Sequence, residues 1–283
     1  MNESFNLTDR QRSCIPDVHF DLIPIRNLVS NQEYQRMLSE SHIAKTIRDF
    51  DVYQINPVKV SRRDGQNYVF DGQHTIETIA TVSGSRDTPV WCMVYDDLQY
   101  QEEAHIFAEQ QKNVKALLPY ETFVAHVEAG DNKQTMINHL VTNVYRLRVT
   151  ASHMPGGICA VGALEFIYDR FGFEVLDRTL RLVLGAWEGD SLSLTSSMLK
   201  GIALVINAYG SNLSDDMFRE QVGKVSPKAV TRLARDRRPG TMGFAEALVI
   251  VYNGKHKKKL SLEKLYWSSK KRKGAAPPDF EQE

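Results

Sequence analysis

The sequence predicts an α+β protein in which a small mixed sheet with helices comes first and an all-α domain follows. Over the first part of the chain, short apolar runs of strand length alternate with helical patterns. Farther on, strand patterns fade and apolar residues recur at helical spacing. We therefore expect four segments: an arm over residues 1–19, an α+β domain over 20–118, a helical domain over 119–254, and a basic, flexible tail over 255–283.

The elements of the first domain follow from alternation and turn signals. Residues 20–29 alternate as a half-buried strand does, and a helical pattern after Ser30 divides near Ser39 or Ser41. The pair Asp64-Gly65 is typical of a tight hairpin turn. It predicts a hairpin between strands at 57–60 and 68–70, followed by a helix, a buried strand over 89–95 and an amphipathic helix over 99–113.

Helical signals dominate the second domain. Residues 120–130 end on a helix-stopping Gly130, and several apolar patterns of helical spacing follow. The helix over 227–238 is the best marked, because Ser226 can cap it and Pro227 suits its first position. A last helix is expected over 244–254. We expect Trp91 and Trp187 in the cores.

Composition places the chain among ordinary soluble proteins. It has 283 residues, 42% of them hydrophobic and 25% charged, and no run near the roughly 18 apolar residues that span a bilayer. The first residues lack the apolar segment of a signal peptide. Cys14, Cys92 and Cys159 stand far apart, which favours free thiols over a disulfide framework or a zinc site. We expect a cytoplasmic protein without a membrane partner.

Charge is balanced overall but uneven along the chain. There are 35 Lys+Arg and 35 Asp+Glu, yet residues 255–273 hold nine Lys/Arg and a single Glu. Such a run attracts phosphate through its local field, or it is a solvated tail, and both interpretations stay open. The candidate contacts in it are Lys257, Lys258 and Lys259.

One short stretch, DGQHT at 71–75, joins a strand directly to a helix. The N–H groups and the positive end of the dipole at a helix N-terminus favour an anion, phosphate above all. Gly72 lets the backbone approach a ligand, and Gln73, His74 and Thr75 can add donors. Asp71 can bind a metal ion or orient His74. The alternative is that His74 only caps the helix.

Residues from about 22 to 122 resemble the ParB/sulfiredoxin-like superfamily, which includes ParB-like nuclease and DGQHR-type domains. The resemblance lies in three pieces in order: YQR at 34–36, the stretch from Ser39 through the DGQHT loop to Ala80, and EEAHIFAEQQKNVKALLPYE at 102–121. It implies that family's small mixed sheet with helices.

The resemblance also implies a site. Gly72, Gln73, His74 and Thr75 would form a phosphate- or nucleotide-binding loop, with the side chains of Arg36 and of Gln110 or Gln111 directed toward it. A nucleoside di- or triphosphate with Mg²⁺ would then be the cofactor. The chain departs from the family in having Thr75 for an arginine, Gln111 for an asparagine and Gln110 for a metal-binding glutamate. These changes weaken metal and triphosphate binding.

Three functions follow as hypotheses. The first is a ParB-like nucleic-acid-binding protein, with DNA as partner and with nucleotide binding and a homodimer left open. The second is a nucleotide-dependent phosphotransferase or a nuclease, in which Asp71, His74 and Glu77 would be catalytic and the metal is unknown. The third is a regulatory protein of a phage or mobile element with a vestigial cleft.

Further nucleic-acid contacts are expected from exposed basic side chains, and the alternative is that these side chains are only solvated surface. Some flank the predicted cleft and others lie on the helix over 227–238. They are Arg62, Arg63, Lys112, Lys115, Lys228, Arg232 and Arg235.

Overall fold

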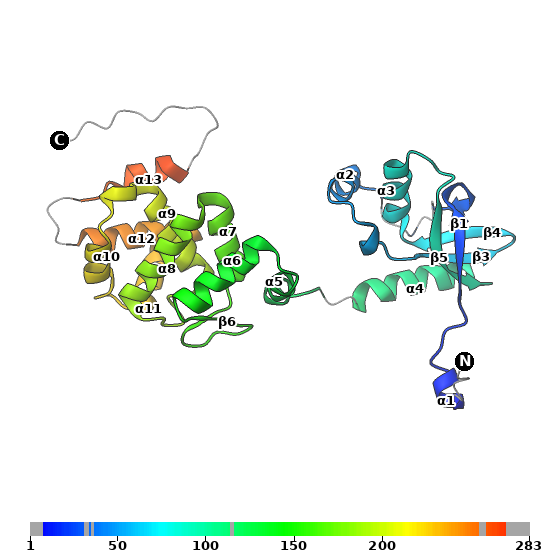
Figure 1. The fold of residues 1–283 in the computed structure, drawn as a ribbon, viewed down its shortest axis with the longest axis horizontal. Coiled ribbons are helices and arrows are strands. Elements are labelled where there is room, and N and C mark those ends of the chain that lie inside the picture. Colours follow the sequence, from blue (N-terminus) through cyan, green and yellow to red (C-terminus); the bar gives the residue numbers. More distant parts are fainter. Residues whose placement is uncertain (1–7, 31–33, 35–36, 114–115, 255–258, 270–283) are drawn as a thin grey trace. The chain divides into compact units, whose positions relative to one another are not determined.

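The computed structural model describes residues 8–30, 34, 37–113, 116–254 and 259–269. It divides into two compact units, residues 1–115 and residues 116–283. The first contains a small mixed sheet with helices and the second consists almost entirely of helices, as Figure 1 shows. The predicted α+β class is therefore confirmed.

The N-terminal unit is built on one five-stranded sheet. Its order is β1-β5-β3-β4-β2, formed by β1 (His19–Pro24), β2 (Leu28–Val29), β3 (Val58–Arg63), β4 (Gln66–Asp71) and β5 (Pro89–Asp96). β5 pairs antiparallel with β1 and parallel with β3, and β4 pairs antiparallel with β3 and parallel with β2. The β3–β4 hairpin turns at Asp64 and Gly65, which both have positive φ, as the sequence predicted.

The single strand expected over residues 20–29 is wrong. The chain leaves β1 at Pro24, passes through the 3-10 turn η1 (Ile25–Asn27) and forms β2 at the opposite edge of the sheet. Proline has no backbone N–H and is confined to strand ends and edges, so it favours a break here. Ile23 and Ile25, on either side of Pro24, are both buried, so the alternation of buried and more exposed side chains continues across the break.

Helices lie on both faces of this sheet. α3 (Gln73–Ser83) packs Ile76 and Ile79 against the valines of β3, β4 and β5. α4 (Tyr100–Asn113) contacts β4 on the other face, and its Glu103 pairs with Arg63 of β3. α2 (Glu40–Arg48) packs on α3 and has no buried residue. A short helix, α1 (Asp9–Arg12), and a 3-10 turn, η2 (Val52–Gln54), complete the unit.

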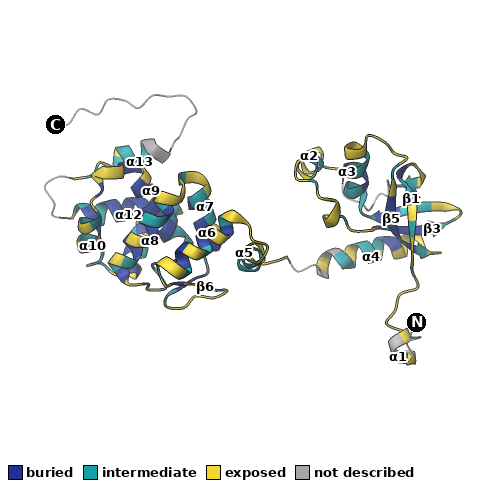
Figure 2. Cartoon of the chain, in the orientation of Figure 1, coloured by how far each residue is buried: buried dark blue, intermediate teal, exposed yellow. Residues whose placement is uncertain are grey.

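The second unit places its largest core around one helix. α9 (Ser196–Tyr209) is almost wholly buried and packs against α7 (Val161–Phe171), α8 (Phe173–Trp187), α12 (Thr241–Asn253) and α13 (Leu262–Ser269). Figure 2 shows the buried residues gathered on these helices. The other elements are α5 (Pro119–Glu128), α6 (Asn132–His139), the π-helical turn η3 (Leu140–Val144), the two-residue strands β6 (Arg148–Val149) and β7 (Gly157–Ile158), the 3-10 turn η4 (Gly210–Asn212), α10 (Asp215–Val222) and α11 (Pro227–Arg237).

The two tryptophans expected in the cores differ. Trp187 is buried, and its indole N–H donates to the Val225 carbonyl. Trp91 is 57% exposed, so that expectation is wrong. Trp91 pairs across the sheet with Leu22, on the face opposite to α3, where Leu22 is also half exposed. No helix among the described residues is long and apolar enough to cross a bilayer.

Candidate functional site

The site predicted from the DGQHT stretch lies where β4 passes into α3. Asp71 is the last residue of β4, and Gly72 caps α3 with φ of +103°. A Cβ at Gly72 would lie 3.2 Å from the Cα atom of Val58, so both the left-handed backbone and the close packing on β3 favour glycine. The first hydrogen bond of the helix runs from Ile76 N–H to the Gly72 carbonyl at 3.1 Å. Gly72 has no side chain that could accept a hydrogen bond from the first N–H groups of α3, so these N–H groups need other partners.

The N-terminus of α2 lies beside this turn. Ser39 caps α2, because its hydroxyl accepts from His42 N–H at 3.3 Å. The backbone N–H of Ser39 donates to Nε2 of His74 at 3.3 Å, and the rings of His42 and His74 meet edge to face at 5.3 Å. A nitrogen that accepts a hydrogen bond carries a lone pair, so a neutral His74 ring has its proton on Nδ1. His74 therefore ties the starts of two helices together.

Pockets open on both sides of His74. One, of about 330 Å³, is lined by Met37, Ser39, His42, Asp71, Gln73, His74 and Phe107. Its walls come from the start of α2, the start of α3 and the middle of α4. We call it the mouth pocket. It combines hydrogen-bonding side chains with the N-terminal turn of a helix, which is the chemistry that holds an oxyanion.

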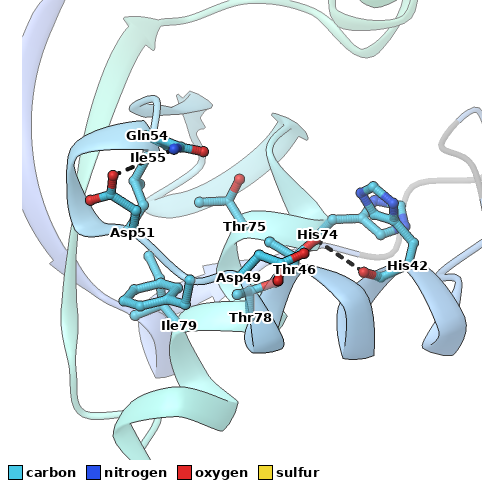
Figure 3. A pocket seen from close by; sticks show the side chains of 11 residues that line it. His42, Thr46, Asp49, Asp51, Gln54, Ile55, His74, Thr75, Thr78 and Ile79 are labelled. Carbon is cyan, nitrogen blue, oxygen red and sulfur yellow. Dashed lines mark hydrogen bonds between the residues drawn. The ribbon is translucent and has the colours of Figure 1, made fainter. Parts of the chain in front are cut away.

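The second pocket, of about 170 Å³, lies between α2, η2 and α3 (Figure 3). His42 and Thr46 of α2 and its C-cap, Asp49, line one side, and Thr75, Thr78 and Ile79 line it from α3. It shares His42 and His74 with the mouth pocket. A third pocket, of about 300 Å³ and mostly apolar, continues past Thr75 and Ile79 to Pro57, Pro89 and Trp91. Thr75 lines the second and third pockets.

A cation that the sequence did not single out stands beside the mouth pocket. Nζ of Lys59, on β3, donates to Oε1 of Gln110 at 2.6 Å and lies 3.5 Å from Oδ2 of Asp71. Gln110 was expected to be directed toward the loop from the helix behind it. In the structure, its amide oxygen and the carboxylate of Asp71 contact the same lysine. No feature of the neighbouring sequence indicates this contact. In the structure, Lys59 lies where the register between β3 and β4 shifts, between Lys59 and Val60.

The three catalytic candidates make different contacts, although Asp71 and His74 both line the mouth pocket. Asp71 pairs with Lys59, whereas Glu77 forms a bidentate pair with Arg86 at 2.8 and 3.0 Å. That hydrogen bond raises the pKa of the Arg86 guanidinium. His74 lies between two pockets, as described above. Within the described residues, no three His, Cys, Asp or Glu side chains gather as a metal site.

Arg62 and Arg63 serve the sheet. Arg62 donates to Asp21 at 2.7 Å and to Asn67 at 3.1 Å. Arg63 donates to the fully buried carboxylate of Glu103 at 2.9 Å and stacks 3.8 Å from the ring centre of Tyr68. The hydrogen bond to Glu103 raises the pKa of Arg63, and burial, with that carboxylate nearby, raises the pKa of the Tyr34 hydroxyl. Each guanidinium is thus paired with a carboxylate of the same unit, and this pairing accounts for both arginines without a ligand.

The remaining candidates near the pocket are only partly described. Lys112 is exposed and pairs with Glu109 on its own helix at 2.5 Å. Arg36 and Lys115 lie outside the described residues, as does the side chain of Gln111.

The basic candidates of the second unit lie mainly on α11. Ser226 caps this helix by accepting from Ala229 N–H at 3.3 Å, and Pro227 is its first residue, as predicted. Val230 and Ala234 are buried, which leaves Lys228, Arg232 and Arg235 exposed together on the other side. Lys259 is exposed, and Lys257 and Lys258 lie outside the described residues.

Comparison with known proteins gives a family but no function. No curated protein matches the chain. Among solved structures, the C-terminally truncated chromosome-partitioning protein ParB from Caulobacter crescentus, complexed with CTP-gamma-S, matches at 11% identity and a TM-score of 0.35. The match covers 82% of this chain and 99% of that one, and it is too distant to support an argument about the site. A family model described as "Family of unknown function (DUF6551)" matches residues 29–264, and the chain belongs to that family.

Proposed function

We propose that the protein binds nucleic acid and that its N-terminal unit binds a phosphate group in the mouth pocket. The observation that carries this proposal is the convergence of Ser39, His42, Gln73 and His74 on a pocket at the N-terminal turn of α3. The phosphate belongs either to a nucleotide or to the DNA backbone, since the same donors suit both.

Three features support phosphate over other ligands. Gly72 adds no side chain, so a ligand can approach the backbone closely there. The helix dipole contributes positive potential at the N-terminus of α3. With Nε2 accepting from Ser39, the neutral His74 ring has its donor at Nδ1. Lys59 supplies a full positive charge 3.5 Å from a residue that lines the pocket.

The exposed basic side of α11 supports the nucleic-acid part of the proposal. Lys228, Arg232 and Arg235 lie about one turn apart on a capped helix, a spacing that suits phosphates along a groove. The engagement of Asp71 by Lys59 and of Glu77 by Arg86 gives no reason to propose turnover. We propose binding alone, with no step through a metal ion.

Isothermal titration calorimetry tests the proposal with two kinds of ligand, the four ribonucleoside triphosphates and a short DNA duplex. We expect the wild-type chain to bind at least one of them. His74→Ala should weaken binding by about tenfold, as the loss of a hydrogen bond to a charged group does.

The matched control is His105→Ala, which removes an exposed imidazole from α4 that lines none of the three pockets described above. Its affinity should equal that of the wild type. Equal affinities for His74→Ala and the wild type would place the phosphate elsewhere, and the absence of any binding by the wild type would refute the proposal.

A further inference from the structure

Lys59 and Asp71 face each other at the end of the sheet where α3 begins. Their Cα atoms are partners in the β3–β4 pairing, immediately before the register shifts at Val60. An irregularity of this kind changes the direction in which a side chain points. The ammonium of Lys59 thereby reaches Asp71 and the Gln110 amide oxygen together.

Asp71 contacts a cation and also lines the pocket that is proposed to bind an anion. Its carboxylate contacts Lys59, and the residue also lines the mouth pocket beside Gln73 and His74. A carboxylate in that position repels an incoming anion unless a cation neutralises it. The mouth of α3 therefore suits an anion only while Lys59 offsets Asp71.

The pair is accessible enough to exchange partners. The side chains of Lys59 and Asp71 are 27% and 35% exposed, and ion pairs in such surroundings are held weakly. An ammonium on a four-carbon stem moves more freely than a guanidinium fork. The 2.6 Å hydrogen bond that Lys59 donates to the amide oxygen of Gln110 keeps the ammonium at this end of the sheet.

We propose that Asp71 is an internal counterion that occupies Lys59 in the free protein, and that an incoming phosphate displaces it. This inference rests on the proposed function of the mouth pocket and names the contact that regulates it. The carboxylate sets how strongly an anion must bind to obtain the lysine.

The inference predicts effects of opposite sign from two neutral substitutions. Lys59→Met should weaken phosphate binding about tenfold, because a charge-assisted contact is lost. Asp71→Asn should strengthen it about threefold to fivefold, because the lysine no longer has a competing carboxylate. Both are measured calorimetrically with pyrophosphate, with the four ribonucleoside triphosphates and with a short DNA duplex, at one ionic strength.

Two variants serve as matched controls for the loss of charge. Lys45→Met removes an exposed lysine from α2, and Asp97→Asn removes an exposed carboxylate between β5 and α4. Neither residue lines the mouth pocket, and both variants should bind like the wild type. Thermal unfolding confirms that each variant is folded. If Lys59→Met does not fold, the gain from Asp71→Asn decides the question.

The outcomes separate this inference from the proposed function. A wild type that binds none of the probes overturns both. A wild type that binds while Lys59→Met or Asp71→Asn stays within twofold of it overturns the inference alone, and so does weaker binding by Asp71→Asn, which would make the carboxylate a ligand. Opposite shifts with the nucleotides only, or with the duplex only, support the inference and identify the source of the phosphate.

Discussion

The two units of the chain differ in what they bury. Among the described residues, the helical unit buries a continuous apolar core around α9 that draws on α6 through α13. Among the described residues of the N-terminal unit, the main buried cluster has nine members, nearly all from one face of its sheet and from α3. Outside this cluster, Phe70 is fully buried against the ring of Tyr95, and Glu103 is fully buried in an ion pair with Arg63.

This difference explains where the pockets lie. A small core leaves helix ends such as those of α2 and α3 at the rim of the sheet, lined with half-buried polar side chains. α2, which buries no residue, is held there by Ser39, His42 and its packing on α3. Elements with few buried contacts are the ones that open most easily, and binding sites are built from them.

The largest expected effect comes from breaking the buried ion pair of the N-terminal unit. Arg63→Met leaves the Glu103 carboxylate buried without its cation, so it should lower the free energy of unfolding by about 3–5 kcal/mol. Urea unfolding followed by circular dichroism measures this. The control is Arg86→Met, whose pair with Glu77 is half exposed and should be worth at most about 1 kcal/mol. Equal losses would show that burial does not distinguish the two pairs.

A substitution in the core of the helical unit should lower the stability of that unit and leave phosphate binding unchanged. Ile202→Ala opens a cavity in the centre of the core, where the residue is fully buried, and should cost about 2–5 kcal/mol. At 25 °C the variant should still bind phosphate with wild-type affinity. Weaker binding by a variant that remains folded would mean that the pocket depends on the helical core.

The buried thiol of the N-terminal unit gives that unit a dependence on alkaline pH. Burial raises the pKa of Cys92 from 9.0 to about 11. The folded thiol keeps its proton where the unfolded one loses it, so stability is full below pH 9 and falls as the pH rises through about 11. The loss should reach about 2–3 kcal/mol. Cys92→Ala should remove this part of the pH dependence in urea unfolding, and an unchanged profile would contradict the assignment.

The smallest effect compares two glycines of the same unit. Gly72→Ala meets Val58 at 3.2 Å in a left-handed backbone, so it should cost about 1–3 kcal/mol and weaken phosphate binding. Gly65→Ala has the same kind of backbone, with φ of +72°, but no atom within 4 Å. It should cost about 1–2 kcal/mol and leave binding unchanged. Similar binding by both variants would show that close packing on β3 is irrelevant to the pocket.

Local signals predicted much of the fold. The hairpin at Asp64-Gly65 and the helix that starts at Ser226-Pro227 form as expected, because turn and cap chemistry depend on neighbouring residues. The division of residues 20–29 between two edges of the sheet was missed, since alternation does not reveal where a strand changes its partner. α10 was also missed, because its pattern is only eight residues long.

The site was predicted in part. The DGQHT stretch does form a strand end, a glycine turn and a helix start beside a pocket. Lys59 was missed because its partner Gln110 is 51 residues away, and nothing in the sequence around it indicates that contact. Arg62 and Arg63 look like free basic side chains in the sequence, yet their acidic partners lie about 40 residues away. Contacts of this range come only from the tertiary structure.

Phosphate binding at the N-terminal turn of α3 can be followed residue by residue. Amide ¹H–¹⁵N NMR spectra are recorded while the wild-type chain is titrated with ribonucleoside triphosphates and with a short duplex. We expect the amide signals of Gly72, Gln73, His74 and Thr75 to shift first and to saturate with one affinity. Signals that stay in place for these four residues while others shift would contradict binding at this turn.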